Sequence, residues 1–186
     1  MERGYKGRDS QIDSVDLAHH ASAELESSLA ARAMSGLKAR ALKLVLAESC
    51  SGGLLSFCFT RLGGASELLL GGLVCYDNAM KTRWLGVSES LLLAHGAVSE
   101  PVVRAMCEGA LAQSGADIAI ATSGIAGPSG GSEAKPVGSV YIALQHRGKE
   151  AVVRLWHFDG ERECVQRETC RAAIAMLESL LNSLDK

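Results

Sequence analysis

Hydrophobic residues along this chain fall into short continuous runs and periodic stripes that alternate in a regular order. Apolar runs of about four to eight residues between polar or glycine positions are typical of buried strands. Such runs predict strands over residues 42–47, 71–76 and 117–122. Residues 139–144 and 151–158 predict two further strands, and Arg147-Gly148-Lys149 between them suits the turn of a hairpin.

Helical periodicity fills most of the segments between these strands. Ser99, Glu100 and Pro101 indicate a strong helix start, with a hydroxyl N-cap, an acid in the first turn and a proline whose missing N–H does no harm. In the last helix, Glu163 and Arg167 form a favourable i,i+4 pair. The predicted helices run from about Leu17 to Arg40, over 54–62, through Lys81 and Trp84, over 88–95, from Ser99 onward, and from near Glu161 to about Leu184.

This alternation of strands and helices, ending in a hairpin, predicts an α/β fold: a three-layer α/β/α sandwich with a mixed, mostly parallel sheet. A chain of 186 residues fits one domain with a single core, which we expect over residues 17–186. Residues 1–16 are polar and charged, and we expect them to form a tail that adds little to the core.

Composition and charge narrow the possible functions. The net charge is −2 with acids and bases interspersed, so the chain lacks the basic patch that nucleic-acid binding requires. No apolar stretch is long enough to span a membrane, and the N-terminus lacks a signal-peptide pattern, so we expect a cytoplasmic protein. The six cysteines include no C-x-x-C pair and the histidines show no metal-ligand spacing, which favours buried, reduced thiols and no metal. A homodimer or higher homo-oligomer is the default for a small soluble enzyme.

Two loops carry candidate chemistry, and the first joins the strand over 42–47 to the next helix. Ser49 in this turn would project from the carboxyl end of the sheet. The amides after it would open the helix unpaired, where they could hold a phosphate or stabilise an oxyanion. These amides belong to Cys50, Ser51, Gly52 and Gly53. An isolated Ser-x-Ser-Gly-Gly, however, is more often a simple helix cap.

The second loop is the glycine-rich stretch over residues 122–131, which also follows a strand. It lacks G-x-G-x-x-G and no helix follows it, so it is neither a dinucleotide fingerprint nor a P-loop. Its length favours a backbone cradle for a ligand over an ordinary connection. Ser132 and Lys135 match the S-x-x-K of penicillin-interacting serine enzymes, but Pro136 disfavours the helix that this motif requires, so we interpret the match as a false positive.

Arg162, Lys81 and Tyr76 are further candidates. Arg162 falls in the first turn of the last helix, where a cation is unfavourable against the helix dipole. An arginine that faces a phosphate or carboxylate would explain this position, and a solvated arginine explains it about as well. Lys81 lies five residues after Tyr76, where a surface lysine is the ordinary outcome. A lysine near Ser49 could instead act as its base, provided that burial lowers its pKa.

Several short motifs, taken in order, resemble the C-terminal domain of the competence/damage-inducible protein family CinA, including its stand-alone nicotinamide-nucleotide amidohydrolases. The resemblance covers roughly residues 37–181, and the ordered set is highly specific. The matching residues are Ala47-Glu48-Ser49-Cys50-Ser51-Gly52-Gly53, Gly71-Gly72, Tyr76-Asp77-Asn78, Lys81, Leu85-Gly86-Val87, Gly96-Ala97-Val98-Ser99, Ser123-Gly124-Ile125-Ala126-Gly127-Pro128, Gly130-Gly131, Lys135-Pro136-Val137-Gly138 and Gly160-Glu161-Arg162.

The resemblance implies hydrolysis of nicotinamide mononucleotide (NMN) to nicotinate mononucleotide and ammonia, without a metal or redox cofactor. It implies that Ser49 is the nucleophile and that Tyr76, Lys81 and Arg162 are the other functional positions. Our mechanistic hypothesis is that Lys81, with Tyr76, takes the serine proton and returns it to the departing ammonia. As substrate-binding residues we expect Arg162, Cys50, Ser51, Gly52, Gly53, Ser123, Gly124, Gly127 and Lys135. Among the departures from the family's usual residues, Asp77 stands where a serine is usual, and its negative charge could alter phosphate affinity.

Three other functions stay open at this point. The chain could be a non-catalytic nucleotide-binding or regulatory module that keeps the pocket, because a fold does not guarantee activity. It could be a serine amidase for another pyridine or nucleotide amide. A partner in competence or DNA repair is a third possibility, against which the missing basic face counts. A binding relic would be expected to lose one of Ser49, Tyr76, Lys81 and Arg162, so the intact set favours an enzyme.

Overall fold

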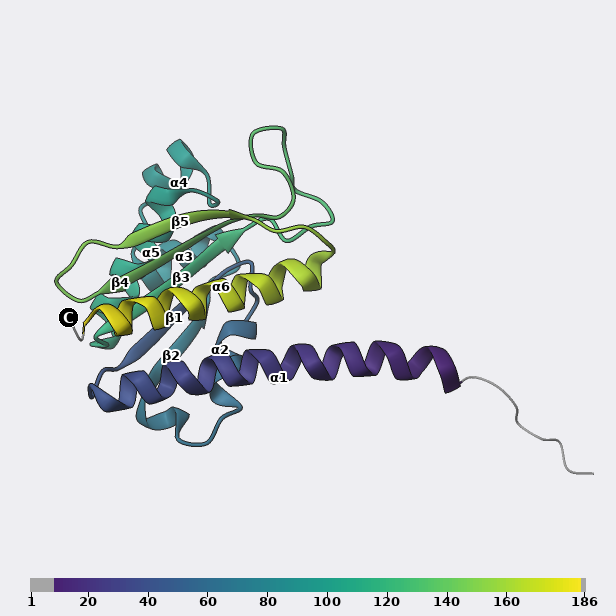
Figure 1. Ribbon diagram of the computed structural model, residues 1–186. Coiled ribbons are helices and arrows are strands. Elements are labelled where there is room, and N and C mark those ends of the chain that lie inside the picture. The colour runs from purple at the N-terminus through teal and green to yellow at the C-terminus, as the bar shows by residue number, and fades with distance from the viewer. Residues whose placement is uncertain (1–8, 185–186) are drawn as a thin grey trace, which may run out of the picture.

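The strands form one sheet whose central members are buried on both faces, as their continuous apolar runs require (Figure 1). The computed structural model describes residues 9–184, with side chains from residue 24 onward. The strand order is β2-β1-β3-β4-β5, for strands β1 (Leu44–Glu48), β2 (Leu69–Val74), β3 (Ile118–Gly124), β4 (Ser139–His146) and β5 (Val152–His157). β1 pairs in parallel with β2 and β3, whereas β4 runs antiparallel to both of its neighbours.

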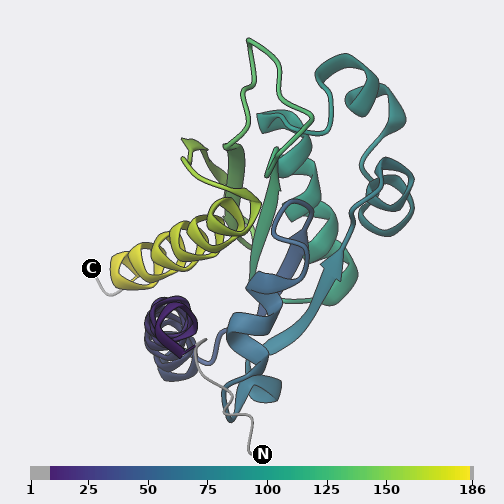
Figure 2. The same ribbon diagram turned by 90° about the vertical axis from the view of Figure 1, so that its right-hand side faces the viewer.

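One face of the sheet carries the larger apolar side chains. Alternate positions of the strands place Leu44, Leu46, Ile118, Ile120 and Ile142 on this face. The helices that bury it are α1 (Asp9–Ala39), α2 (Leu54–Thr60) and α6 (Arg162–Ser183). α1 and α6 pack side by side, and Figure 2 shows both on the same side of the sheet.

The opposite face is built from smaller side chains. Val45, Ala47, Ala119, Ala121 and Ala143 lie here and contribute to a second buried cluster with the helices. Those helices are α3 (Asn78–Leu85), α4 (Glu89–His95) and α5 (Glu100–Ser114). Together the two faces give the predicted three-layer α/β/α fold with a mixed sheet (Figure 2).

The packing on this second face is close. A Cβ added to Gly109 of α5 would lie 1.8 Å from the carbonyl oxygen of Leu85, at the end of α3. Position 109 therefore accepts no side chain without a shift of backbone, and the absence of one lets α5 approach α3 at this point.

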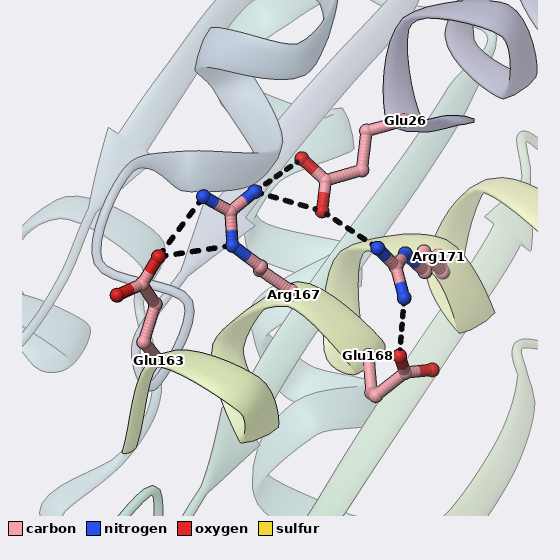
Figure 3. Close-up of polar contacts among 5 residues, drawn as sticks. All are labelled: Glu26, Glu163, Arg167, Glu168 and Arg171. Carbon is pink, nitrogen blue, oxygen red and sulfur yellow. Dashed lines mark hydrogen bonds and ion pairs between the residues drawn. The ribbon is translucent and has the colours of Figure 1, made fainter. Parts of the chain in front are cut away.

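An ion-pair network centred on a buried glutamate joins α1 to α6 (Figure 3). Glu26 on α1 is 2% exposed, and its carboxylate oxygens accept hydrogen bonds from Arg167 Nη1 at 3.1 and 2.9 Å. Arg171 Nη2 lies 3.5 Å from the same carboxylate. Arg167 also makes the predicted pair with Glu163, and Arg171 pairs with Glu168. We call these five residues the Glu26 network; it fixes α6 against α1.

Two helix starts differ from those predicted. α1 begins at Asp9 and not near Leu17, so residues 9–16, predicted as part of a tail, are helical; residues 1–8 lie outside the described part of the chain. Ser99 precedes α5 as predicted, but its hydroxyl does not cap the helix. It donates instead to the carbonyl oxygen of Gly96 at 2.8 Å.

The cysteines are free thiols, and all are buried except Cys164, which lies in the first turn of α6. Among the described residues, no group of three histidine, cysteine or acidic side chains is placed to hold a metal ion. Over the same residues, no helix combines the length and the apolar character that crossing a bilayer requires.

Candidate active site

A cavity of about 330 Å³ opens at the carboxyl ends of β1, β2 and β3. The parallel strands bring their following segments to this edge, where ligand sites of open α/β sheets commonly lie. Ser49 and Cys50 line the cavity from the turn after β1, and Tyr76, Asn78 and Lys81 from the segment after β2. The rest of the lining comes from Ala97 and Val98, from residues between 123 and 130 of the glycine-rich loop, and from Arg162 at the start of α6.

Ser49 is held in place through its backbone. Its amide donates to the carbonyl oxygen of Thr122 at the end of β3, at 3.0 Å. The Thr122 hydroxyl lies 2.8 Å from the hydroxyl of Ser51. Residues 49–53, which we call the nucleophile turn, are therefore attached to β3 as well as to β1. Ser49 itself is largely buried, with 9% of its surface exposed at the cavity.

Glu48, the last residue of β1, occupies the start of α2. It is fully buried, and its carboxylate accepts from the amides of Gly53 at 3.0 Å, Leu55 at 3.1 Å and Ser56 at 2.8 Å. The Ser51 hydroxyl also donates to it, at 2.7 Å. A carboxylate satisfies the unpaired donors of a helix N-terminus and is stabilised by the helix dipole. Sequence reasoning missed this role, because Glu48 lies six residues before Leu54, the first residue of α2, and the N-cap position itself is occupied by Gly53.

The prediction of four unpaired amides in the nucleophile turn is therefore wrong. The Gly53 amide is bonded to Glu48, and the Gly52 amide donates to the carbonyl oxygen of Ser49 at 3.2 Å. Within the described part of the chain, the amides of Cys50 and Ser51 donate to no oxygen atom. They remain as candidate oxyanion donors, and α2 offers no free N-terminus for a phosphate. Ser51, Gly52 and Gly53 are not among the residues that line the cavity.

Lys81 is a buried lysine inside α3, with 1% of its surface exposed. Its ammonium nitrogen donates to the carbonyl oxygens of Cys75 at 2.9 Å and Tyr76 at 3.2 Å. Burial lowers the pKa of Lys81, because removal from water disfavours the charged form. A neutral lysine has two N–H donors and one lone pair, so both carbonyl contacts persist after deprotonation and the lone pair is left to accept a proton.

Tyr76 and Arg162 close the cavity on its outer side. Arg162 Nη2 donates to the Tyr76 hydroxyl at 2.6 Å, and Nη1 donates to the carbonyl oxygen of Gly127 at 2.9 Å. The side chain of Arg162 thus links α6 to the segment after β2 and to the glycine-rich loop. Tyr76 is 59% exposed and Arg162 is also exposed, so both are accessible to a ligand.

Of three other residues singled out in the sequence, only Ser123 lines the cavity. Its hydroxyl donates to the carbonyl oxygen of Ala97 at 2.8 Å. Lys135 does not line the cavity; its ammonium donates to the carbonyl oxygens of His95 at 3.2 Å and of Val98, a lining residue, at 2.6 Å. Asp77 accepts from the amide of Ala79 at 2.7 Å, so its carboxylate caps α3.

The charge of the cavity favours an anionic ligand. Arg162 is its permanently charged cation, Lys81 adds positive charge only when protonated, and among the described residues no aspartate or glutamate lines it. Arginine presents several N–H donors in a planar fork that matches the oxygens of a phosphate or carboxylate. The volume lies within the range of small-molecule sites, which is about 300–1,000 Å³.

Sequence comparisons find relatives over most of the chain. A family model for the CinA C-terminal domain matches residues 26–181. A CinA-like protein of Syntrophus aciditrophicus is 48% identical over 146 residues, which is 78% of this chain and 34% of that protein. A putative competence-damage inducible protein of Symbiobacterium thermophilum is 47% identical over 159 residues, or 80% of this chain and 37% of that protein. The chain thus spans about a third of the length of these curated relatives.

Solved structures share the fold over nearly their whole length. A competence-damaged protein (CinA) superfamily protein from Klebsiella pneumoniae aligns with a TM-score of 0.82 at 36% identity, covering 85% of this chain and 98% of that one. A competence/damage inducible protein from Agrobacterium tumefaciens aligns with a TM-score of 0.81 at 37% identity, covering 84% of this chain and 95% of that one.

Proposed function

Because this chain belongs to the family of the CinA C-terminal domain, we propose that it is an amidohydrolase that converts NMN and water to nicotinate mononucleotide and ammonia. The observation that carries the proposal is that one cavity brings together Ser49, Lys81, Tyr76 and Arg162 from three separate segments. A hydroxyl nucleophile, a lysine of lowered pKa and an arginine for an anion are the groups that hydrolysis of a phosphate-bearing amide requires.

The first step forms an acyl-enzyme. Ser49 Oγ attacks the carboxamide carbon, and the neutral amine of Lys81 takes the hydroxyl proton. The carbonyl oxygen becomes an oxyanion, and the amides of Cys50 and Ser51, which donate to no oxygen atom within the described part of the chain, are its candidate donors. Lys81 then gives its proton to the nitrogen of the leaving group, the carbon–nitrogen bond breaks, and ammonia departs.

The second step restores the enzyme. Water attacks the ester carbon, Lys81 accepts a proton from that water, and the bond to Ser49 Oγ breaks as the serine regains its proton. The product carries a carboxylate where the substrate carried an amide. No redox change occurs in either step, and the cavity residues supply the base.

Arg162 and the glycine-rich loop would hold the phosphate of the nucleotide. Arg162 is exposed at the mouth of the cavity and is already oriented by Gly127 and Tyr76. The opposite end of the cavity, at Ser49, cannot take the phosphate at α2 because Glu48 already occupies that helix start. The substrate therefore binds with its carboxamide at the nucleophile turn and its phosphate at α6.

The direct test is ammonia release from NMN by the purified chain, beside Ser49→Ala and a matched Ser35→Ala control at an exposed site on α1. We expect release by the wild type and by the control, and loss of release in Ser49→Ala. Lys81→Met should lose turnover while it still binds NMN. Arg162→Ala should raise KM for NMN far more than for nicotinamide riboside, which has no phosphate.

Three results would overturn the proposal. Ser49→Ala with normal turnover would exclude the serine mechanism. No release by a folded protein that still binds NMN would favour a nucleotide-binding or regulatory module. The names of the relatives are also compatible with such a module, because they state no enzyme activity. Release from another pyridine amide but not from NMN would assign a different substrate to the same site.

A further inference from the structure

The first two turns of α6 contact two different parts of the cavity. Arg162 reaches the glycine-rich loop and Tyr76, as described above. Gln166, one turn later, donates from Nε2 to the carbonyl oxygen of Cys50 at 3.0 Å, in the nucleophile turn. Residues four apart lie on the same face of a helix, so one face of α6 carries both contacts.

Gln166 also packs closely on the nucleophile turn. A Cβ added to Gly52 would lie 3.2 Å from Gln166 Nε2, and Gly52 has a φ of +65°. A glycine at this position therefore adopts the positive φ that the turn requires and leaves room for the Gln166 amide. Gln166 is half-buried and does not line the cavity, so a bound substrate would meet it only through the turn.

The helix between the two contacts is rigid and well anchored. Four residues of α-helix span about 6 Å, and the hydrogen-bonded backbone keeps this distance fixed. The buried side chains of Val165, Thr169 and Cys170 anchor these turns of the helix in the core. The Glu26 network holds the adjoining face of α6 against α1 (Figure 3). The helix therefore fixes the positions of Arg162 and Gln166 relative to each other.

We propose that Gln166 is a positioning residue that ties the nucleophile turn to the helix carrying Arg162, so that binding of the substrate phosphate aligns the carboxamide with Ser49. This inference rests on the proposed function. Binding energy from a remote part of a substrate raises kcat only when a rigid connection converts it into alignment at the reacting bond. Arg162 binds the phosphate, and Gln166 connects α6 to the nucleophile turn.

The inference predicts a specific pattern in the kinetics of two substrates. In the wild type, NMN should have a higher kcat than nicotinamide riboside, because only NMN uses Arg162. In Gln166→Met, which keeps the length of the side chain and removes its donor, kcat for NMN should fall about 10- to 100-fold toward the value for the riboside. KM for NMN should change less than twofold, since Arg162 is intact.

A merely structural role for Gln166 predicts a different pattern. Loss of stability would lower the activity on both substrates in proportion and would lower the Tm. Gln113→Met, at an exposed position on α5 away from the cavity, is the matched control and should leave both kcat values unchanged. An unchanged kcat for NMN in Gln166→Met, or an equal fall for NMN and the riboside, would overturn the inference.

A second measurement does not need turnover and separates this inference from the proposed function. Hydrogen exchange of the Cys50, Ser51 and Gly52 amides, followed by NMR, should be faster in Gln166→Met than in the wild type and in Gln113→Met. Inorganic phosphate should slow this exchange in the wild type and not in Gln166→Met. If the wild type released no ammonia from NMN, the proposed function would fail, whereas this result would still support the tie between α6 and the turn. Equal exchange in all three proteins would overturn it.

Discussion

Replacing Glu26 by glutamine removes the buried charge on which both arginines of the Glu26 network converge. The side chain is nearly isosteric, so packing is preserved and the change is electrostatic. Glu26 contacts Arg167 at 2.9 Å and Arg171 at 3.5 Å, and it is 2% exposed. A glutamine can accept from one arginine, but its amide group would then face the other.

The size of the effect follows from what each arginine retains. Breaking a buried ion pair by removing one partner costs about 3–5 kcal/mol when the remaining charge is uncompensated. Here the side chains of Arg167 and Arg171 keep 21% and 22% exposure, and each keeps a second partner in Glu163 or Glu168. We therefore expect a loss of about 2–3 kcal/mol in the free energy of unfolding, or a fall in Tm of about 4–12 °C for a chain of this size.

Urea and thermal unfolding, followed by circular dichroism, measure this loss. Glu67→Gln is the matched control, because its pair with Lys38 of α1 is exposed, with side-chain exposures of 61% and 69%. Such surface pairs contribute about 0–1 kcal/mol, so the control should stay close to the wild type. A Glu26→Gln protein no less stable than Glu67→Gln would refute the view that the network fixes α6.

Four further results are expected. Because burial lowers the pKa of Lys81 and the neutral amine is the active form, kcat/KM for NMN should rise with pH at values below those of an ordinary lysine, and Lys81→Arg should abolish this limb. Glu48→Gln should lower both kcat and stability, the latter by about 2–4 kcal/mol, because at least one buried amide loses its acceptor. Gly109→Ala should destabilise by about 1–3 kcal/mol in urea unfolding, since its Cβ would lie 1.8 Å from Leu85 O. Alkylation of the native protein with a maleimide, read by mass spectrometry, should modify Cys164 and leave the buried thiols unmodified.

Much of the fold could be predicted from the sequence because the central strands are buried on both faces. β1 and β3 read as continuous apolar runs, and their predicted positions agree with the structure to within two residues at each end. The start of α1 was not predicted, since residues 9–16 are mainly polar, and Ile12 and Val15 alone are too few to distinguish helix from tail. The hydroxyl of Ser99 was assigned to a cap because sequence shows the residue type but not the nearby carbonyl of Gly96 that it prefers.

The candidate site was predicted less completely. Ser49, Tyr76, Lys81 and Arg162 were all identified from their motifs, and the structure places them in one cavity. Gln166 was not identified, since its contact with the nucleophile turn joins residues 116 positions apart. Lys135 was assigned to the pocket, whereas it does not line the cavity and its ammonium donates to two backbone carbonyls. Contacts of this kind depend on how loops and helices pack, and no local pattern encodes them.

The unequal faces of the sheet also bear on how sequences with this fold can diverge. On the face under α1, α2 and α6, leucine, isoleucine and valine side chains can exchange volume with one another, so compensating substitutions are available. On the face under α5, alanines such as Ala119, Ala121 and Ala143 have little side-chain volume that a neighbouring substitution could compensate. Gly109 there lies against the backbone of Leu85. Random mutagenesis with selection for folded protein should therefore recover varied residues on the first face and near-invariant ones on the second. The α5 side would then change most slowly as the family evolves, for reasons of space that are independent of catalysis.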